Sequence, residues 1–188
     1  MHPRFLDCRL WHKDYKPARL IAKKRIQQVE AKEYLINKFI KDFGLDKKTI
    51  ITRNTIASGK NIWNYSVTHA KGTTMIMFAK WPIGIDAICI DDIPSIKNLA
   101  SSKYFNKQEK VWLSTHTTKR DFGLIWTAKE AVYKCVYNTT KKPMAFSQWN
   151  FSAEQGYFVY YKGKDKYIVE IGTSEPKYIF CVCHKEDE

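Results

Sequence analysis

The chain has 188 residues, of which 44% are hydrophobic, and 32 Lys and Arg against 19 Asp and Glu give it a formal charge of +13. This length suits one large domain or two small ones whose core needs no disulfide support. No stretch reaches the roughly 20 apolar residues of a membrane span, and the first residues lack the apolar segment of a signal peptide. We therefore expect a cytoplasmic protein without membrane contact.

The excess of positive charge favours an anionic partner. A nucleic acid, an acidic protein and a polyphosphate ligand all fit it, and so does the simpler interpretation of a solvated, lysine-rich face. The five cysteines show the spacing of neither a zinc site nor a disulfide framework. Cys89, Cys181 and Cys183 lie in apolar runs, so we predict that they are small buried residues.

The first half of the chain is predicted to form one helix followed by strands. Apolar residues recur with a helical period over 17–43, and this pattern ends at Gly44. Short apolar runs between turn residues indicate strands, and the last three should form an antiparallel meander. The predicted strands are 49–52, 65–69, 74–79 and 83–90.

A polar stretch after residue 91 divides the chain, and the same order of elements then repeats. The second half is helix-rich over 104–137 and returns to strand-like runs at 157–161, 167–171 and 178–182. We therefore predict an α+β fold with two similar lobes, a pseudo-dimer in which each lobe packs a helix on short antiparallel strands. The predicted lobes are 1–91 and 92–188.

Asp86 is the first residue whose type does not match its surroundings. Strand alternation places it on the same face as Ile88 and Ile90, within a segment that is apolar on both faces. A carboxylate in such a place needs a cation or several hydrogen-bond donors. A turn-capping aspartate or a structural ion pair would satisfy this need as well as a metal site would.

Three charged residues follow on the helix predicted around Trp126. Glu130 and Lys134 are four residues apart on one flank of the apolar stripe, so they can address one ligand or simply pair with each other. Lys129 falls near the centre of that stripe and needs an anion. A core carboxylate and a phosphate in a cleft are both possible, and the phosphate suits the neighbouring residues better.

Asp86 and Glu130 together would suffice for a magnesium site. Mg²⁺ is usually held by one or two protein carboxylates, keeps several waters and bridges phosphate oxygens. A nearby lysine can neutralise the charge on a departing phosphate. These residues thus predict a centre for phosphate chemistry, although spacing alone does not name the reaction.

The order of four segments resembles that of the 4'-phosphopantetheinyl transferase superfamily. Its most specific parts are the G-[VI]-D and W-[ST]-x-K-E-[AS]-x-x-K patterns, and the likeness extends over about 20–151. By length the chain resembles the larger, surfactin-synthetase-activating type, in which one chain holds two lobes with the active site between them. The four segments are 65–69, 83–86, 104–109 and 126–134.

The resemblance implies a reaction and its partners. Phosphopantetheine would pass from coenzyme A to a serine of an acidic apo carrier protein, with release of adenosine 3',5'-bisphosphate. It also implies that the protein is a monomer. Asp86 and Glu130 match the family's magnesium ligands, and Lys134 matches a lysine near the pyrophosphate, whose developing charge it would stabilise together with the metal. Glu130 is the preferred base for the serine proton, either directly or through a metal-bound water.

Further residues match family positions that contact coenzyme A. His69 matches the histidine at the 3'-phosphate, with Thr68 beside it, and Lys60 matches a phosphate-contacting lysine in the preceding turn. Basic residues at 23–25 could add phosphate contacts, but their alignment with the family is open. Glu109 is either a helix-start residue or a supporting residue of the site.

Two departures from the family pattern concern the metal and the histidine motif. Many large members carry a second acid two residues after the motif aspartate, where this chain has Ile88. The metal would then hold one more water or be bound more weakly, or Asp92 could approach it if the strand continued that far. In the histidine motif Thr68 and Ala70 replace serines, so one hydroxyl is kept and one is lost.

Two other functions remain open from the sequence. A basic nucleic-acid-binding module would explain the charge and the tyrosines at 160, 161 and 167, if these are exposed. Against it stands the absence of any recognised nucleic-acid-binding motif in the sequence. An inactive relative of the transferases is the other possibility, for which Ile88 is the hint.

Overall fold

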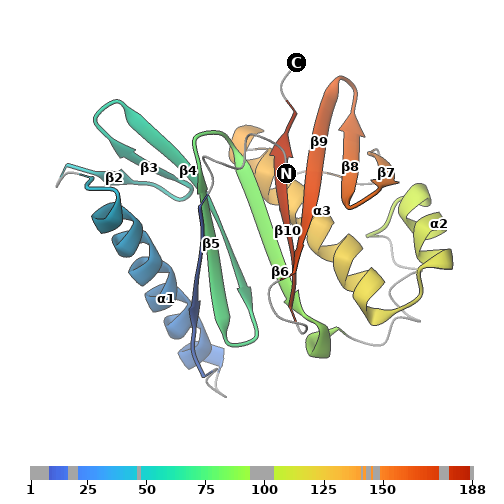
Figure 1. Ribbon diagram of the computed structural model, residues 1–188, viewed down its shortest axis with the longest axis horizontal. Coiled ribbons are helices and arrows are strands. Elements are labelled where there is room, and N and C mark those ends of the chain that lie inside the picture. Colours follow the sequence, from blue (N-terminus) through green and yellow to red (C-terminus); the bar gives the residue numbers. More distant parts are fainter. Residues whose placement is uncertain are drawn as a thin grey trace.

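The computed structural model has two lobes that lie side by side, each with a five-stranded antiparallel sheet (Figure 1). It describes residues 9–16, 21–45, 48–93, 104–140, 142, 145, 149–173 and 178–186. The first lobe contains β1 (Arg9–Asp14), α1 (Ile21–Asp42), β2 (Ile50–Ile51), β3 (Thr55–Ser58), β4 (Asn61–Ala70) and β5 (Thr73–Ala79). The second contains β6 (Ile83–Cys89), η2 (Ile90–Asp92), α2 (Lys107–Thr115), α3 (Lys119–Thr140), β7 (Asn150–Glu154), β8 (Tyr157–Lys162), β9 (Asp165–Thr173) and β10 (Tyr178–Lys185).

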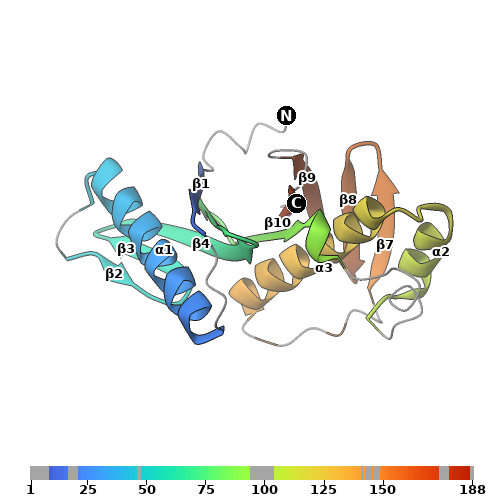
Figure 2. The same cartoon turned by 90° about the horizontal axis from the view of Figure 1, so that it is seen from below.

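The first sheet has the strand order β1-β5-β4-β3-β2, and α1 covers it. Viewed from below, α1 lies over this sheet while α3 accompanies the second one (Figure 2). The apolar face of α1 buries Leu35, Ile36 and Phe39, and the ring of Phe39 stacks on that of Phe78. The helix predicted from its periodicity is thus confirmed, and it ends just before Gly44, which has a positive φ of 58°.

The second sheet has the strand order β6-β10-β9-β8-β7, and α3 packs across it. The buried side of α3 alternates aliphatic residues with small ones, which lets the helix lie close to the strands. Cys89, Cys181 and Cys183 are buried, as predicted. The α+β fold with two lobes is therefore confirmed.

One prediction about the strands is wrong. β6 does not continue a meander with β4 and β5, because it pairs with β10 in the second sheet. Long-range pairing decides this, and the chain passes from one sheet to the other between Ala79 and Ile83. A division into domains after residue 91 stays a prediction.

β6 nevertheless lies beside β4 and so joins the two lobes. Its odd-numbered side chains, such as Ile83 and Ile85, share an apolar cluster with Met75, Met77 and Ala79 of β5. Its even-numbered residues, which include Asp86, face α3. Each lobe therefore contributes one wall to the space around Asp86.

Gly84 allows the close contact between β6 and α3. A Cβ at this position would overlap the backbone carbonyl of Ala131 on α3 and come within 2.7 Å of the Cys135 amide. Backbone atoms cannot rotate aside as side-chain ends can. The glycine is therefore a packing requirement that holds α3, with its charged residues, against the strand that carries Asp86.

Gly84→Ala is expected to lower the free energy of unfolding by about 1–3 kcal/mol, because the helix must move outward. Urea denaturation measures this change. Gly123→Ala is the matched control, since the three nearest neighbours of its Cβ would be side-chain methyl groups, of Ile93, Ile179 and Ile88, and alanine favours the helix. A loss in the control as large as that of Gly84→Ala would show that the backbone contact is not the cause.

Candidate active site

A pocket of about 360 Å³ opens where the two lobes meet. Its walls come from α1, the segment between β2 and β3, β4 and α3. Among the described lining residues, the cationic or basic side chains are Lys32, Arg53, His69 and Lys134, and the acidic one is Glu130. Its other lining residues are Asn54, Tyr65, Ser66, Val67, Tyr133, Tyr137 and Asn138.

Asp86 lies beside this pocket on β6 and is held by two donors. Its Oδ1 accepts hydrogen bonds from Lys134 Nζ at 2.7 Å and from the Thr68 hydroxyl at 2.9 Å. The two donors come from α3 and β4, which belong to different lobes. The partly buried carboxylate is thus held in one orientation.

Lys134 bridges the lobes through its three ammonium protons. Besides Asp86 it donates to the carbonyl of Val67 on β4 at 3.1 Å and to that of Ile85 on β6 at 2.9 Å. A lysine ammonium has three donors, so this set uses all of them within the protein. The lysine therefore acts as a structural bridge as well as a positive charge in the pocket.

Glu130 lies one helical turn before Lys134 and is half-buried. Burial raises the pKa of Glu130, and the negative charge of Asp86 raises it further, while Lys134 and Lys129 oppose the shift. Asp86 is thus near enough to repel Glu130. The structure therefore brings Asp86, Glu130 and Lys134 together, as the sequence led us to expect.

His69 lines the same pocket and lies near the C-terminal end of β4. Its Nδ1 is 2.8 Å from the Thr74 hydroxyl. Although the side chain reaches the surface, desolvation and the charges of Lys134 and Lys32 lower the pKa of His69 to about 4. The ring is thus neutral at pH 7 in the free protein, and three basic residues share one small region.

A model of the 4'-phosphopantetheinyl transferase superfamily matches residues 82–183. The chain belongs to this superfamily. The matched range includes Asp86, Glu130 and Lys134, so the protein is a transferase of the phosphopantetheinyl type. A search of curated proteins found no match.

The transferase was also expected to hold a metal ion. Among the described residues no three His, Cys, Asp or Glu side chains gather as a metal-binding group. The charge of Asp86 does act on Glu130 and raises its pKa, and such repulsion between carboxylates is of the kind that a divalent cation relieves. In number and chemistry they fit Mg²⁺, which needs one or two carboxylates when phosphate and water supply the rest.

The second acid of the family pattern, whose position is Ile88 here, is not replaced by Asp92. β6 ends at Cys89 and is followed by the 3-10 helix η2, which contains Asp92. The Asp92 side chain is exposed there, and its Oδ1 lies 3.8 Å from Nζ of Lys71. The expectation that Asp92 approaches the metal shell is therefore wrong. Ile88 itself packs against the core of the second lobe.

Lys60 is the predicted site residue that the structure separates from the others. It lies at the tip of the β3–β4 hairpin, at the opposite end of β4 from His69. Nine residues of extended strand correspond to about 30 Å. Lys60 is not among the residues that line the pocket, and a contact with coenzyme A stays a prediction.

Two basic residues of the transferase pocket were missed by sequence reasoning. The exposed basic residues near the start of α1, at positions 23–25, were considered, but the lining lysine of this helix is Lys32. The Arg53 side chain extends to α3, where its Nη1 lies 3.4 Å from the hydroxyl oxygen of Tyr137. No local pattern in the sequence singles out Lys32, because the burial of its neighbour Ala31 is seen only in the structure.

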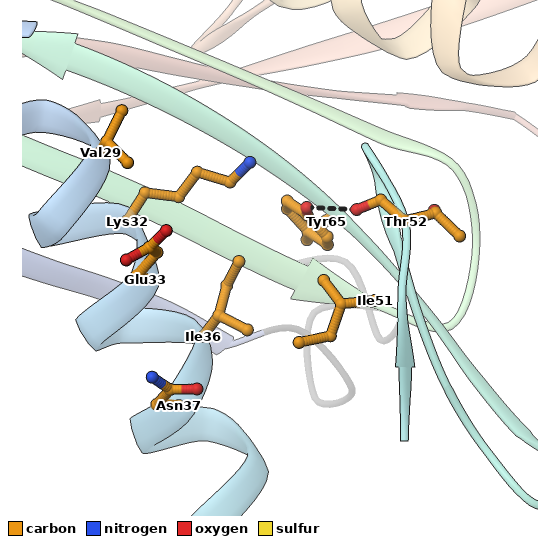
Figure 3. A pocket seen from close by; sticks show the side chains of 8 residues that line it. All are labelled: Val29, Lys32, Glu33, Ile36, Asn37, Ile51, Thr52 and Tyr65. Atoms are coloured by element: carbon orange, nitrogen blue, oxygen red, sulfur yellow. Dashed lines mark hydrogen bonds between the residues drawn. The ribbon is translucent and has the colours of Figure 1, made fainter. Parts of the chain in front are cut away.

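A second, more apolar pocket of about 420 Å³ adjoins the first (Figure 3). Lys32 and Tyr65 line both, and Figure 3 shows the Lys32 side chain extending from α1 toward the Tyr65 ring. The Tyr65 hydroxyl donates to the carbonyl of Thr52 at 2.7 Å, which ties β4 to the segment after β2. Val29 and Ile51 form its exposed apolar rim.

Lys129 finds its anion inside the protein. Its Nζ donates to Glu109 Oε2 at 2.6 Å, and both side chains are almost fully buried. Glu109 also accepts from the Tyr160 hydroxyl at 3.0 Å and forms a capping box with Asn106 at the start of α2. The expectation of a phosphate partner for Lys129 is thus wrong, and Glu109 supports the helices of the second lobe.

The buried tyrosines also weaken the case for a nucleic-acid module. Tyrosines 160, 161 and 167 were expected to be exposed. Tyr161 is partly exposed, whereas Tyr160 and Tyr167 are only 0% and 2% exposed. They are therefore core residues and offer no stacking surface to a base. Among the described residues, no helix is long and apolar enough to cross a membrane.

Proposed function

We propose that the protein transfers 4'-phosphopantetheine from coenzyme A to a serine of an apo carrier protein, with Mg²⁺, and releases adenosine 3',5'-bisphosphate. The observation that carries this proposal is a pocket lined by Glu130, on which the charge of the neighbouring Asp86 acts, and by otherwise basic charged groups among the described residues. Carboxylates suit a metal ion and the basic groups suit phosphates. The superfamily membership supports the class of reaction.

The basic residues of the pocket would receive the donor. Lys32 and Arg53 come from the first lobe, on α1 and after β2, and His69 comes from β4. Coenzyme A carries a pyrophosphate and a 3'-phosphate, so it offers anions to several cations at once. A phosphate near His69 would raise the low pKa of this ring and allow it to take up a proton.

Glu130 would accept the proton of the carrier serine as its oxygen attacks the β-phosphorus of the donor. The new bond joins the serine oxygen to this phosphorus. The bond from the phosphorus to the bridging oxygen breaks, and adenosine 3',5'-bisphosphate leaves with the electron pair. Mg²⁺, when bound by Asp86 and Glu130, supplies charge stabilisation at the pyrophosphate. Lys134 holds Asp86 in place throughout.

The carrier protein would approach from the open side of the pocket. The formal charge of +13 favours an acidic partner, whose association such a charge accelerates. We expect a monomeric enzyme, because both lobes of one chain already line the pocket. A cytoplasmic location is part of the same proposal.

Lys32→Met is expected to raise the dissociation constant of coenzyme A about tenfold, the equivalent of one lost charge-assisted hydrogen bond. Isothermal titration calorimetry measures this constant. Lys41→Met, on the same helix but outside the pocket, is the matched control and should bind as the wild type does. If the protein bound random oligonucleotides in a salt-dependent manner and did not bind coenzyme A, the nucleic-acid alternative would replace this proposal.

A further inference from the structure

Two hydroxyl groups of β4 form a seam with β6. The amide of Ile85 donates to the Ser66 hydroxyl and the amide of Ala87 donates to the Thr68 hydroxyl, each at 3.0 Å. β6 is the edge strand of the second sheet, so these amides point away from its partner β10. Buried amides need acceptors, and here the side chains of the other lobe supply them.

Thr68 differs from Ser66 because it also contacts the candidate metal ligand. Its oxygen accepts from Ala87 N and its proton goes to Asp86 Oδ1 at 2.9 Å. A threonine hydroxyl has one proton to donate. The side chain is only 3% exposed, so it lies beneath the pocket surface and not on it.

We propose that Thr68 is a positioning residue, which orients Asp86 for the metal ion and does not contact the phosphates of the donor. Thr68 and Lys134 together fix Oδ1 of Asp86 from both lobes. This inference rests on the proposed function, since it takes Asp86 as a metal ligand. It replaces the expectation that Thr68 joins His69 at the 3'-phosphate.

The two roles predict different binding defects in Thr68→Val, which keeps the shape of the side chain and removes the hydroxyl. If Thr68 is a positioning residue, its loss should weaken the binding of the metal ion. Loss of such an outer contact typically weakens metal binding by about 10–100-fold. If Thr68 instead contacts a phosphate, its loss should weaken the binding of coenzyme A even without metal.

The experiment measures two constants for each variant. The first is the dissociation constant of coenzyme A in EDTA, by calorimetry. The second is that of Mn²⁺ at saturating coenzyme A, by electron paramagnetic resonance. We expect Thr68→Val to bind coenzyme A as the wild type does and Mn²⁺ at least about tenfold more weakly. Thr68→Ser keeps the hydroxyl and should restore Mn²⁺ binding.

Thr139→Val is the matched control, because it makes the same chemical change on α3, where the hydroxyl donates to the carbonyl of Cys135 in its own helix. It should change neither constant. The inference would be overturned if Thr68→Val weakened the binding of coenzyme A in EDTA and left the binding of Mn²⁺ unchanged. It would also be overturned if Thr68→Val changed neither dissociation constant.

A structural measurement separates this inference from the proposed function. Hydrogen exchange at the Ala87 amide should be faster in Thr68→Val than in Thr68→Ser or the control, because the amide loses its acceptor. Unchanged exchange would contradict the inferred contact whatever the protein binds. A wild-type protein that bound neither coenzyme A nor Mn²⁺ would instead contradict the proposed function and remove the metal ligand that Thr68 is inferred to orient.

Discussion

Glu130→Gln is expected to lower the rate of phosphopantetheinyl transfer by at least about 10²-fold, the usual contribution of a positioned base. Glutamine keeps the size of the side chain and removes both its charge and its ability to accept the serine proton. The residue is half-buried, and its neighbour Asp86 repels a second negative charge, so the neutral variant should fold as well as the wild type. A single-turnover assay with an apo carrier measures the rate.

The pH dependence of the wild type gives a second view of Glu130. Its pKa is raised, first by burial and then by Asp86. A base works only when deprotonated, so activity should be present above this raised pKa and lost as the pH falls through it. The acid limb of the rate profile should therefore lie higher than an ordinary glutamate gives, and it should move to lower pH as the Mg²⁺ concentration rises, because the cation competes with the proton for Glu130. Full activity in Glu130→Gln would remove this residue from the mechanism.

Lys129→Met is expected to lower the free energy of unfolding by about 3–5 kcal/mol, the usual cost of removing one partner of a buried ion pair. Burial lowers the pKa of Lys129, but Glu109 at 2.6 Å opposes this effect and keeps the pair together. Without the lysine, Glu109 remains buried without its cation. The loss should appear in urea denaturation as a lower midpoint with an unchanged slope.

Two further variants separate the ion pair from the packing. Lys129→Met combined with Glu109→Leu removes both charges and should recover much of the lost stability. Lys38→Met breaks the exposed pair between Lys38 and Asp42 on α1 and should cost at most about 0.5 kcal/mol. A double variant no more stable than Lys129→Met alone would mean that packing and not charge sets the cost.

The fold could be predicted wherever the hydrophobic pattern was strong. The helical period of α1 and the apolar runs of β5, β6 and β10 gave the correct elements. β1 was missed because its sequence, Arg9–Asp14, is largely polar, as suits the edge of a sheet. The partner of β6 could not be predicted from local pattern, because pairing with the distant β10 depends on contacts across the whole second lobe.

The candidate site shows the same limit at the level of single residues. Asp86, Glu130 and Lys134 could be singled out because their types conflict with an apolar strand or share one helix flank. The partner of Lys129 could not be predicted from the sequence, because Glu109 lies on another helix, 20 residues earlier. Lys60 matches a motif position but precedes β4, at the opposite end of this strand from His69, so its contact with coenzyme A stays a prediction.

The central claim is tested most directly by the intact mass of a carrier protein. Several apo carrier proteins are incubated with coenzyme A, Mg²⁺ and this protein. The intact mass of each carrier is then measured by mass spectrometry. We predict that at least one gains the mass of a single phosphopantetheine group on its serine, and that EDTA or Glu130→Gln prevents the gain. If no carrier acquired the group under any of these conditions, the proposed reaction would be contradicted.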